Sequence, residues 1–273
     1  MSAALTVEAE NLTVRYGHHT VLRDIDFQAR AGCISVIAGP NGSGKTTLLK
    51  ALCGDLPHAG TIRLNGHDIS GLKPHQMAAR RGVLAQETML SFPFTVAEVV
   101  RIGISARSGP PADRASSDLR VTEALAAVDL ACFAGRFYQE LSGGERQRVQ
   151  LARVLCQIWE PVDDAGPCWL FLDEPVSSLD IRHQIGVMEL AADYARRGGG
   201  VIAVMHDLNL TAMFADRVTL LSSGNVVAAG TPDMVMSDAA LSETFGCRLR
   251  VGVKPSNGLF ILPHAIVDQV APS

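Results

Sequence analysis

Apolar and polar residues alternate with a period of two through the first part of the chain. The apolar positions are Leu5, Val7, Leu12, Val14, Tyr16, Ile25 and Phe27. Successive side chains of a strand point to opposite faces, so this alternation predicts antiparallel strands that are buried on one face. Turns are expected near Gly17 and at residues 31–32, because glycine permits the backbone conformations that tight turns need.

Later apolar runs are continuous rather than alternating. They occupy residues 33–39, 169–175, 199–207 and 217–224. Short continuous runs of this kind are typical of parallel strands that are covered on both faces. Segments with helical spacing separate these runs, and strands that alternate with helices predict an α/β fold with a mostly parallel sheet.

The middle of the chain has a different character. Residues 61–66 and 81–86 still read as strands, but from about 87 to 160 the apolar spacing is helical. We therefore expect one domain with two parts. Residues 1–86 and 161–273 would form the core and the antiparallel strands, and residues 87–160 would form an α-helical subdomain.

Two further segments carry local predictions. The stretch at 158–167 contains two prolines and a glycine, so we expect a loop before the next buried strand. Residues 247–263 alternate around Ser-Asn-Gly at 256–258, which predicts two strands joined by a turn.

Composition narrows the function classes. The 273 residues are 47% hydrophobic and 19% charged, and the net charge is −4. This charge gives no electrostatic reason to expect nucleic acid as a partner. The six cysteines lack metal-type spacing, which favours buried thiols in a reducing compartment. With no secretory signal and no apolar run near the roughly 18 residues of a membrane span, we expect a cytoplasmic protein.

One glycine-rich stretch carries specific chemistry. GPNGSGKT at 39–46 fits G-x-x-x-x-G-K-[ST] between an apolar strand and a helix, which is the context that a phosphate-binding loop requires. Its backbone N–H groups would surround phosphates, Lys45 would place a charge beside them, and Thr46 would ligate Mg²⁺. The candidate phosphate-binding residues are Gly39, Pro40, Asn41, Gly42, Ser43, Gly44, Lys45, Thr46 and Thr47.

Two acidic residues and a histidine follow buried strands. Asp173 and Glu174 end the run at 169–175, and His206 ends the run at 199–207. Asp173 is a candidate to hold Mg²⁺ and Glu174 to polarise a water, which suits hydrolysis. The alternatives are a carboxylate pair that caps the next helix and a structural histidine. A GTPase is disfavoured because the chain has no N-K-x-D segment.

A second stretch, ELSGGERQRVQ at 140–150, begins a long amphipathic helix with two adjacent glycines. Ser142 and Glu145 have the spacing of a capping box, which starts a helix without any ligand. Gly143 and Gly144 need another reason, because glycine costs about 1 kcal/mol against alanine inside a helix. We expect them to allow close approach of the backbone to a ligand.

Taken together, these motifs resemble the nucleotide-binding subunits of ABC transporters. The phosphate loop, LSGGERQ (141–147), LFLDEP (170–175), SSLD (177–180) and His206 occur in that family's order and spacing over nearly the whole chain. The resemblance implies a P-loop ATPase with a RecA-like core, an antiparallel β subdomain and an α-helical subdomain, which binds ATP and Mg²⁺.

The resemblance also implies roles for single residues. Tyr16 would stack on adenine, and Gln86 would reach Mg²⁺ and the nucleophile. With Thr46 and Asp173 as further metal ligands, Glu174 would be the catalytic base and His206 the γ-phosphate switch. Ser142, Gly143, Gly144 and Asp180 would meet the ATP that Lys45 of a second copy binds. Taken singly, Tyr16 could be an ordinary strand aromatic, Gln86 a strand-end polar residue and Asp180 a helix cap.

Partners follow from the same resemblance. It implies a head-to-tail homodimer over two ATPs on the cytoplasmic face of a bacterial inner membrane, with two copies of a permease subunit. Segments 77–103 and 173–184 resemble the ATPases of iron-chelate, haem and vitamin B12 uptake, and MAARRGVLAQE, LARVLCQIW and ILPHA are most similar to haem importers. A periplasmic haem-binding protein would then be an indirect partner. Siderophore or B12 import, and a soluble ABC ATPase without a transport role, are the alternatives.

Overall fold

A computed structural model of the chain describes residues 5–86, 92–106 and 114–263. Its centre is a six-stranded sheet with the order β12-β11-β3-β10-β9-β6. The strands of this sheet are β3 (Ile34–Ala38), β6 (Arg81–Leu84), β9 (Trp169–Asp173), β10 (Gly200–Val204), β11 (Arg217–Ser222) and β12 (Asn225–Gly230). All neighbours pair in parallel except β11 and β12. The predicted mostly parallel sheet is therefore confirmed.

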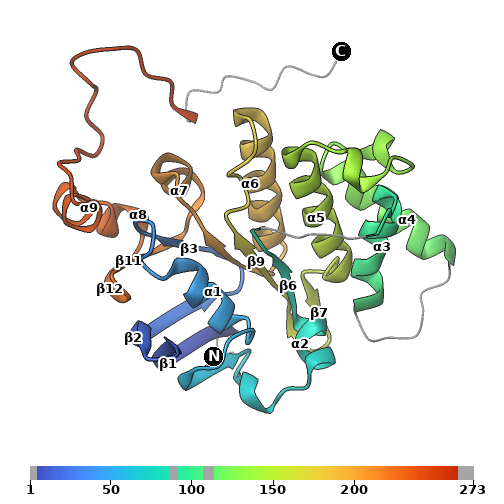
Figure 1. Cartoon of the computed structure of the whole chain (residues 1–273), viewed down its shortest axis with the longest axis horizontal. Coiled ribbons are helices and arrows are strands. Elements are labelled where there is room, and N and C mark those ends of the chain that lie inside the picture. The colour runs from blue at the N-terminus through green and yellow to red at the C-terminus, as the bar shows by residue number, and fades with distance from the viewer. Residues whose placement is uncertain (1–4, 87–91, 107–113, 264–273) are drawn as a thin grey trace.

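A second sheet is antiparallel and has the order β2-β1-β4-β5. Its strands are β1 (Thr6–Tyr16), β2 (His19–Arg30), β4 (Ala59–Leu64) and β5 (His67–Asp68). The alternating pattern of the first residues produces one buried face, as predicted, with Val7, Leu12 and Val14 turned into the core. Figure 1 shows β1 and β2 in blue beside α1.

Helices cover the sheets. They are α1 (Lys45–Leu52), α2 (Pro74–Arg80), α3 (Val96–Ala106), α4 (Arg114–Ala127), α5 (Gly143–Gln157), α6 (Ile181–Arg196), α7 (Leu208–Phe214), α8 (Pro232–Val235) and α9 (Asp238–Phe245). The helices α3, α4 and α5 pack together at one side of the molecule (Figure 1). They lie within the range expected to be helical, but the division at residues 87 and 161 stays a prediction. Within the described ranges, no helix has the length and apolar character needed to cross a membrane.

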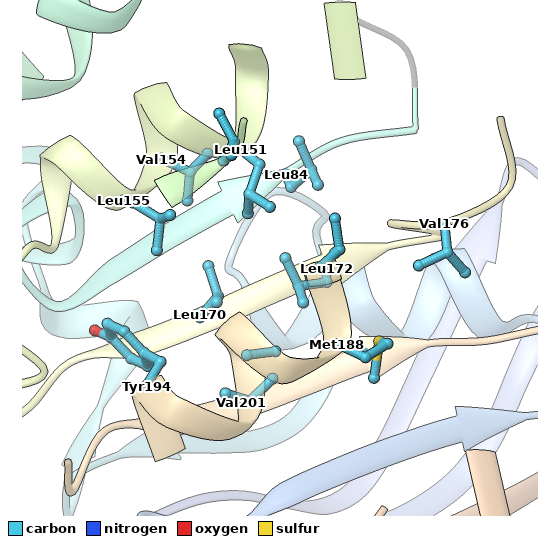
Figure 2. Packing of buried hydrophobic residues seen from close by; sticks show 14 of the residues in the cluster. Leu84, Leu151, Val154, Leu155, Leu170, Leu172, Val176, Met188, Tyr194 and Val201 are labelled. Carbon is cyan, nitrogen blue, oxygen red and sulfur yellow. The ribbon is translucent and has the colours of Figure 1, made fainter. Parts of the chain in front are cut away.

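The apolar core lies on both faces of the six-stranded sheet, because successive side chains of its strands point to opposite sides. On β9, Leu170 and Leu172 join the cluster under α5 and α6, whereas Trp169 and Phe171 join the cluster with α1 and the antiparallel sheet. Figure 2 shows the first cluster, in which Leu170 and Leu172 lie between side chains of α5 and of α6. Burial on both faces accounts for the continuous apolar runs in the sequence.

Two local predictions were wrong. The expected loop at 158–167 contains a short hairpin of β7 (Val162–Asp163) and β8 (Gly166–Pro167), and Arg80 forms a 2.5 Å ion pair with Asp163. The expected strands at 247–263 are not formed. A two-stranded hairpin is marginal by itself, and this segment is instead attached to α9 by single bonds such as Val251 N–H to Asp238.

The packing of α3 against α5 makes a specific stability prediction. A Cβ added to Gly103 would lie 2.0 Å from the carbonyl oxygen of Arg153, so the two helices can approach only because position 103 has no side chain. Gly103→Ala is expected to lower the free energy of unfolding by about 1–3 kcal/mol through overpacking, measured by urea denaturation. Gly186→Ala in α6 is the control. Its added Cβ meets nothing within 4 Å, so it should raise stability by roughly 0.5–1 kcal/mol. Equal effects of the two substitutions would contradict this account of the helix contact.

Candidate functional site

The glycine-rich loop joins β3 to the first residue of α1. Three of its glycines have positive φ, with values of 150° at Gly39, 77° at Gly42 and 102° at Gly44. A Cβ on Gly39 would lie 2.1 Å from the carbonyl oxygen of Leu221, so only glycine fits there. The loop conformation therefore follows directly from the glycine pattern.

Lys45 is the first residue of α1 and is buried. Its ammonium group donates to the carbonyl oxygens of Gly39 at 3.0 Å and Pro40 at 2.9 Å. Burial lowers the pKa of Lys45, while the nearby carboxyl groups of Glu174 and Asp173 act in the opposite direction. The charge is thus held inside the curve of the loop, where it would meet an anion.

Asp173 ends β9 and is 2% exposed. One carboxylate oxygen accepts a hydrogen bond from the hydroxyl of Thr46 at 3.0 Å. Burial raises the pKa of Asp173, and Thr46 partly offsets this effect. A hydroxyl beside a carboxylate offers the hard oxygen ligands that Mg²⁺ prefers, so these two side chains fit that ion.

Glu174 directly follows β9 and lies between side chains from two neighbouring strands. Its Oε2 accepts from the amide nitrogen of Gln86 at 3.0 Å, and its Oε1 lies 2.6 Å from Nε2 of His206. The sheet order explains the meeting, because β6, β9 and β10 are parallel neighbours and end at the same edge. The alternative that Asp173 and Glu174 cap the next helix is wrong, since Asp180 is the N-cap of α6.

Of these side chains, Lys45, Thr46, Glu174 and His206 line a cavity of about 260 Å³. It is lined by Val21, Asn41, Gly42, Gly44, Lys45, Thr46, Thr47, Glu174 and His206. A larger groove of about 970 Å³ runs beside α6 and α7, but none of the phosphate-loop residues lines it. The chemistry therefore lies at the smaller cavity. In the same loop, the buried hydroxyl of Ser43 has no hydrogen-bond partner in the described part of the chain, although Ser43 is not among the residues that line this cavity.

The structure adds one lining residue and leaves one predicted residue untested. Val21 lines it and was not identified from the sequence, because a valine in an alternating strand carries no chemical signal. Tyr16 lies at the end of β1, is 51% exposed and is not among the lining residues. Its stacking on adenine stays a prediction.

The LSGGERQ stretch begins α5 as the sequence predicts. The Ser142 hydroxyl accepts from Glu145 N–H at 3.3 Å, and the Glu145 carboxylate accepts from Ser142 N–H at 2.7 Å, forming a capping box. An added Cβ on Gly143 would meet nothing within 4 Å, whereas one on Gly144 would lie 3.1 Å from the carbonyl oxygen of Ser178. The close contact with Ser178 thus explains why position 144 is a glycine. No contact within the described part of the chain explains the glycine at position 143.

The start of the LSGGERQ stretch and the SSLD aspartate do not line the cavity. Ser142, Gly143, Gly144 and Asp180 are not among the residues that line it. The Asp180 side chain is 66% exposed, caps α6 by accepting from His183 N–H at 3.0 Å, and contacts the His183 ring at 2.8 Å. The hydrogen bonds from His183 lower the pKa of Asp180. Within one chain, these four residues therefore do not contribute to the phosphate loop's cavity.

Comparison with known proteins shows the family. Residues 22–177 match the family model described as ABC transporter. A hemin import ATP-binding protein from Rhizobium etli is 55% identical over 263 residues, covering 96% of this chain and 99% of that protein. A hemin import ATP-binding protein from Jannaschia sp. is 57% identical over 261 residues, covering 95% and 94%.

Solved structures give the same fold. A dimeric ATP-binding cassette in a post-hydrolysis state, bound to ADP and Pi, matches with a TM-score of 0.73 and 26% identity over 83% of this chain and 98% of that chain. A metal-chelate type ABC transporter in an inward-facing conformation matches with a TM-score of 0.72 and 25% identity over 89% of each chain. The predicted P-loop fold class is confirmed.

The burial of Asp173 makes a prediction for the metal-free protein. Asp173→Asn keeps an acceptor for Thr46 but removes a buried charge, so the free energy of unfolding at neutral pH should rise by roughly 0.5–2 kcal/mol. Because folding raises this pKa above its ordinary value of 3.8, the protonated carboxyl stabilises the fold at low pH, and that contribution is lost as pH rises through the folded pKa.

The stability gain of the asparagine variant should therefore be small near pH 4 and complete at neutral pH. Urea unfolding in EDTA across this range measures it. A variant that is less stable than the parent at neutral pH would show that the carboxylate is better compensated than its burial indicates.

Proposed function

The chain belongs to the ABC transporter ATP-binding family, and on that premise we propose that it is the ATP-hydrolysing subunit of a bacterial haem importer. ATP binding and hydrolysis coupled to transport are the chemistry of this family. The haem assignment is supported by relatives named hemin import ATP-binding proteins at 53–57% identity over nearly the whole chain. The transported haem would cross through a separate inner-membrane permease.

One observation carries the hydrolytic mechanism: the Glu174 carboxylate is held between Gln86 and His206 at the mouth of the phosphate loop. Glu174 would accept a proton from the attacking water, because a carboxylate within hydrogen-bond reach of the nucleophile is a suitable general base. Gln86 and His206 would fix the two carboxylate oxygens, and His206 would sense the γ-phosphate.

The phosphate loop would bind the triphosphate through backbone N–H groups and through Lys45. Lys45 would exchange its present carbonyl partners for β- and γ-phosphate oxygens, which are stronger acceptors. Bound Mg²⁺ would neutralise charge that develops on the phosphates. Thr46 and Asp173 would hold this ion, with Gln86 nearby, and Tyr16 would stack on the adenine ring.

A second copy of the chain would complete each site. Ser142 and Gly143 are exposed at the N-terminus of a 15-residue helix, a position that attracts phosphate, yet they do not line their own chain's cavity. A head-to-tail homodimer would place them and Asp180 over the ATP of the other copy. Two solved structures of one related cassette are described as dimeric.

The permease would contact the surface that begins at Gln86. Phe92 is 68% exposed and packs edge-on against Phe94 at 6.2 Å, just before α3. An exposed aromatic residue at this position suits a short apolar helix of a membrane subunit. The remaining expectations are two permease copies, a peripheral position on the cytoplasmic face of the inner membrane and a periplasmic haem-binding protein. The apolar stretch at 91–100 would contribute to the same surface, and of these residues only residue 91 lies outside the described ranges.

A siderophore or vitamin B12 importer is the second candidate, supported by the likeness to a metal-chelate type transporter. The greater identity to hemin import proteins favours haem. A soluble ABC ATPase without a transport role is least supported, because those relatives function in import by name.

Mixing variants tests whether two chains share each site. Ser142→Arg and Glu174→Gln should each lower ATPase activity by at least about 100-fold. In a head-to-tail dimer, a Ser142→Arg chain paired with a Glu174→Gln chain has one site with both residues intact. Mixing the two inactive proteins should therefore restore activity, measured as phosphate release.

The control is the double variant mixed with the parent chain. Each site of such a heterodimer lacks one residue, so added double variant should suppress activity rather than leave half of it. If the parent–double mixture keeps one active site and the single variants do not complement each other, each site is formed within one chain.

The cargo is tested by reconstitution of the complete transporter in lipid vesicles. ATPase activity should rise when the periplasmic binding protein is loaded with haem, and haem should accumulate on the far side. A siderophore- or cobalamin-binding protein, loaded with its own ligand, is the matched control. Stimulation by one of these proteins in place of the haem-loaded one would assign the cargo to the second candidate.

A further inference from the structure

We propose that Gln147 is a positioning residue for hydrolysis, because its side-chain amide holds the main chain of Glu174. This inference rests on the role proposed above for Glu174. Gln147 is the last residue of LSGGERQ and lies on α5, whereas Glu174 follows β9. The hydrogen bond runs from Nε2 of Gln147 to the carbonyl oxygen of Glu174 at 2.9 Å.

The main chain of Glu174 needs such support. Its φ is +52°, in the left-handed region that residues other than glycine rarely adopt. In a residue other than glycine this conformation is unfavourable and persists only where surrounding contacts hold it. It lets the chain turn directly after β9, so that the carboxylate meets Gln86 and His206 at the sheet edge.

Other bonds to this peptide are longer. The Glu174 carbonyl also accepts from the Ser177 hydroxyl at 3.2 Å and from Ser177 N–H at 3.4 Å, and Glu174 N–H donates to Val204 at 3.2 Å. The Ser177 bonds come from the same turn and move with it. Gln147 brings the shortest bond, and it comes from a separate helix.

The contacts of the Gln147 amide indicate which of its two polar atoms faces Glu174. Its Oε1 is buried without a hydrogen-bond partner in the described part of the chain. A buried acceptor without a partner is unfavourable. The reversed amide would place Oε1 against the Glu174 carbonyl oxygen, two acceptors facing each other. The bond to Glu174 therefore sets the orientation of the side chain.

Two other glutamines of α5 show how this one differs. Gln150 donates to the Tyr138 hydroxyl at 3.0 Å, and Gln157 donates to the carbonyl oxygens of Ala78 and Arg81 at 2.8 and 2.9 Å. Those bonds join α5 to neighbouring structural elements. Gln147 instead joins α5 to the residue proposed as the catalytic base.

The position of Gln147 gives the bond a consequence for the dimer. Ser142, at the N-cap of the same helix, would meet the ATP bound by the other copy. A shift of α5 on that contact would move Gln147 and, through it, the Glu174 peptide of the chain that carries both residues. The bond would thus make the geometry of one site depend on whether nucleotide is bound at the other.

The experiment is a double-mutant cycle on the full-length protein with its permease. Gln147→Leu removes the donor and keeps similar volume. We expect kcat to fall about tenfold, which is about 1.4 kcal/mol of transition-state stabilisation, while ATP affinity and KM stay within about twofold. In the Glu174→Gln background, the same substitution should change the residual rate by less than about twofold, because the carboxylate that it positions is already absent.

Gln150→Leu is the matched control, since it removes a buried amide from the same helix without contact to Glu174. It should lower the melting temperature at least as much as Gln147→Leu, because it also removes the acceptor of Arg153, but it should act equally in both backgrounds. If Gln147→Leu lowered kcat by the same factor in the parental and the Glu174→Gln backgrounds, the inference about Gln147 would be overturned and the role proposed for Glu174 would stand. Near-parental turnover by Glu174→Gln would overturn the proposed base, and the inference with it.

Discussion

Parallel pairing of strands buried on both faces is the constraint on which the site depends. The strands β6, β9, β10 and β3 are neighbours in one sheet and run in the same direction, so the segments that follow them begin at one edge. Each of those segments carries polar side chains. The strands before them are buried among apolar residues, where polar groups without partners would be unfavourable. Ligand sites of open α/β sheets form at this edge for the same reason.

The site is held together at a cost to the free protein. Asp173 is buried with a raised pKa, Lys45 is buried with a lowered one, and Glu174 has a left-handed backbone. Each is unfavourable for the chain alone, and each places a group where a nucleoside triphosphate would use it. Such conflicts between local preference and observed structure concentrate at functional sites. The large apolar clusters on both faces of the sheet stabilise the fold against them.

The helix α5 connects two kinds of contact. Its N-terminus is exposed and capped by its own side chains, so it stays formed without a ligand. Its middle packs on β6 and on α3, and the glycine at 103 permits the latter contact. Gln147 lies between these regions and reaches the Glu174 peptide. In the proposed dimer, one end of this helix would meet the ATP of the other copy while Gln147 contacts the proposed catalytic base, so the helix would be suited to transmit a small displacement.

Features that depend on residues close together in the chain could be predicted from the sequence. The phosphate loop needs glycines at set positions, the capping box needs Ser142 and Glu145 three residues apart, and strands covered on both faces need continuous apolar runs. These features depend on backbone sterics and nearby hydrogen bonds, which act over a few residues. The family resemblance indicated which motifs, far apart in the chain, would contribute to the same site.

Only the tertiary structure decided how residues far apart in sequence meet. It set Gln86 and His206 on the two oxygens of Glu174, gave Gly144 its close contact with Ser178, placed Val21 at the cavity and connected Gln147 to Glu174. It also left the tail after α9 without the strands that its alternation predicts. The physical reason is the order of strands in the sheet, which is not their order in the chain. Alternation and spacing specify what each segment prefers, but which segments become neighbours is settled by burying all of them at once.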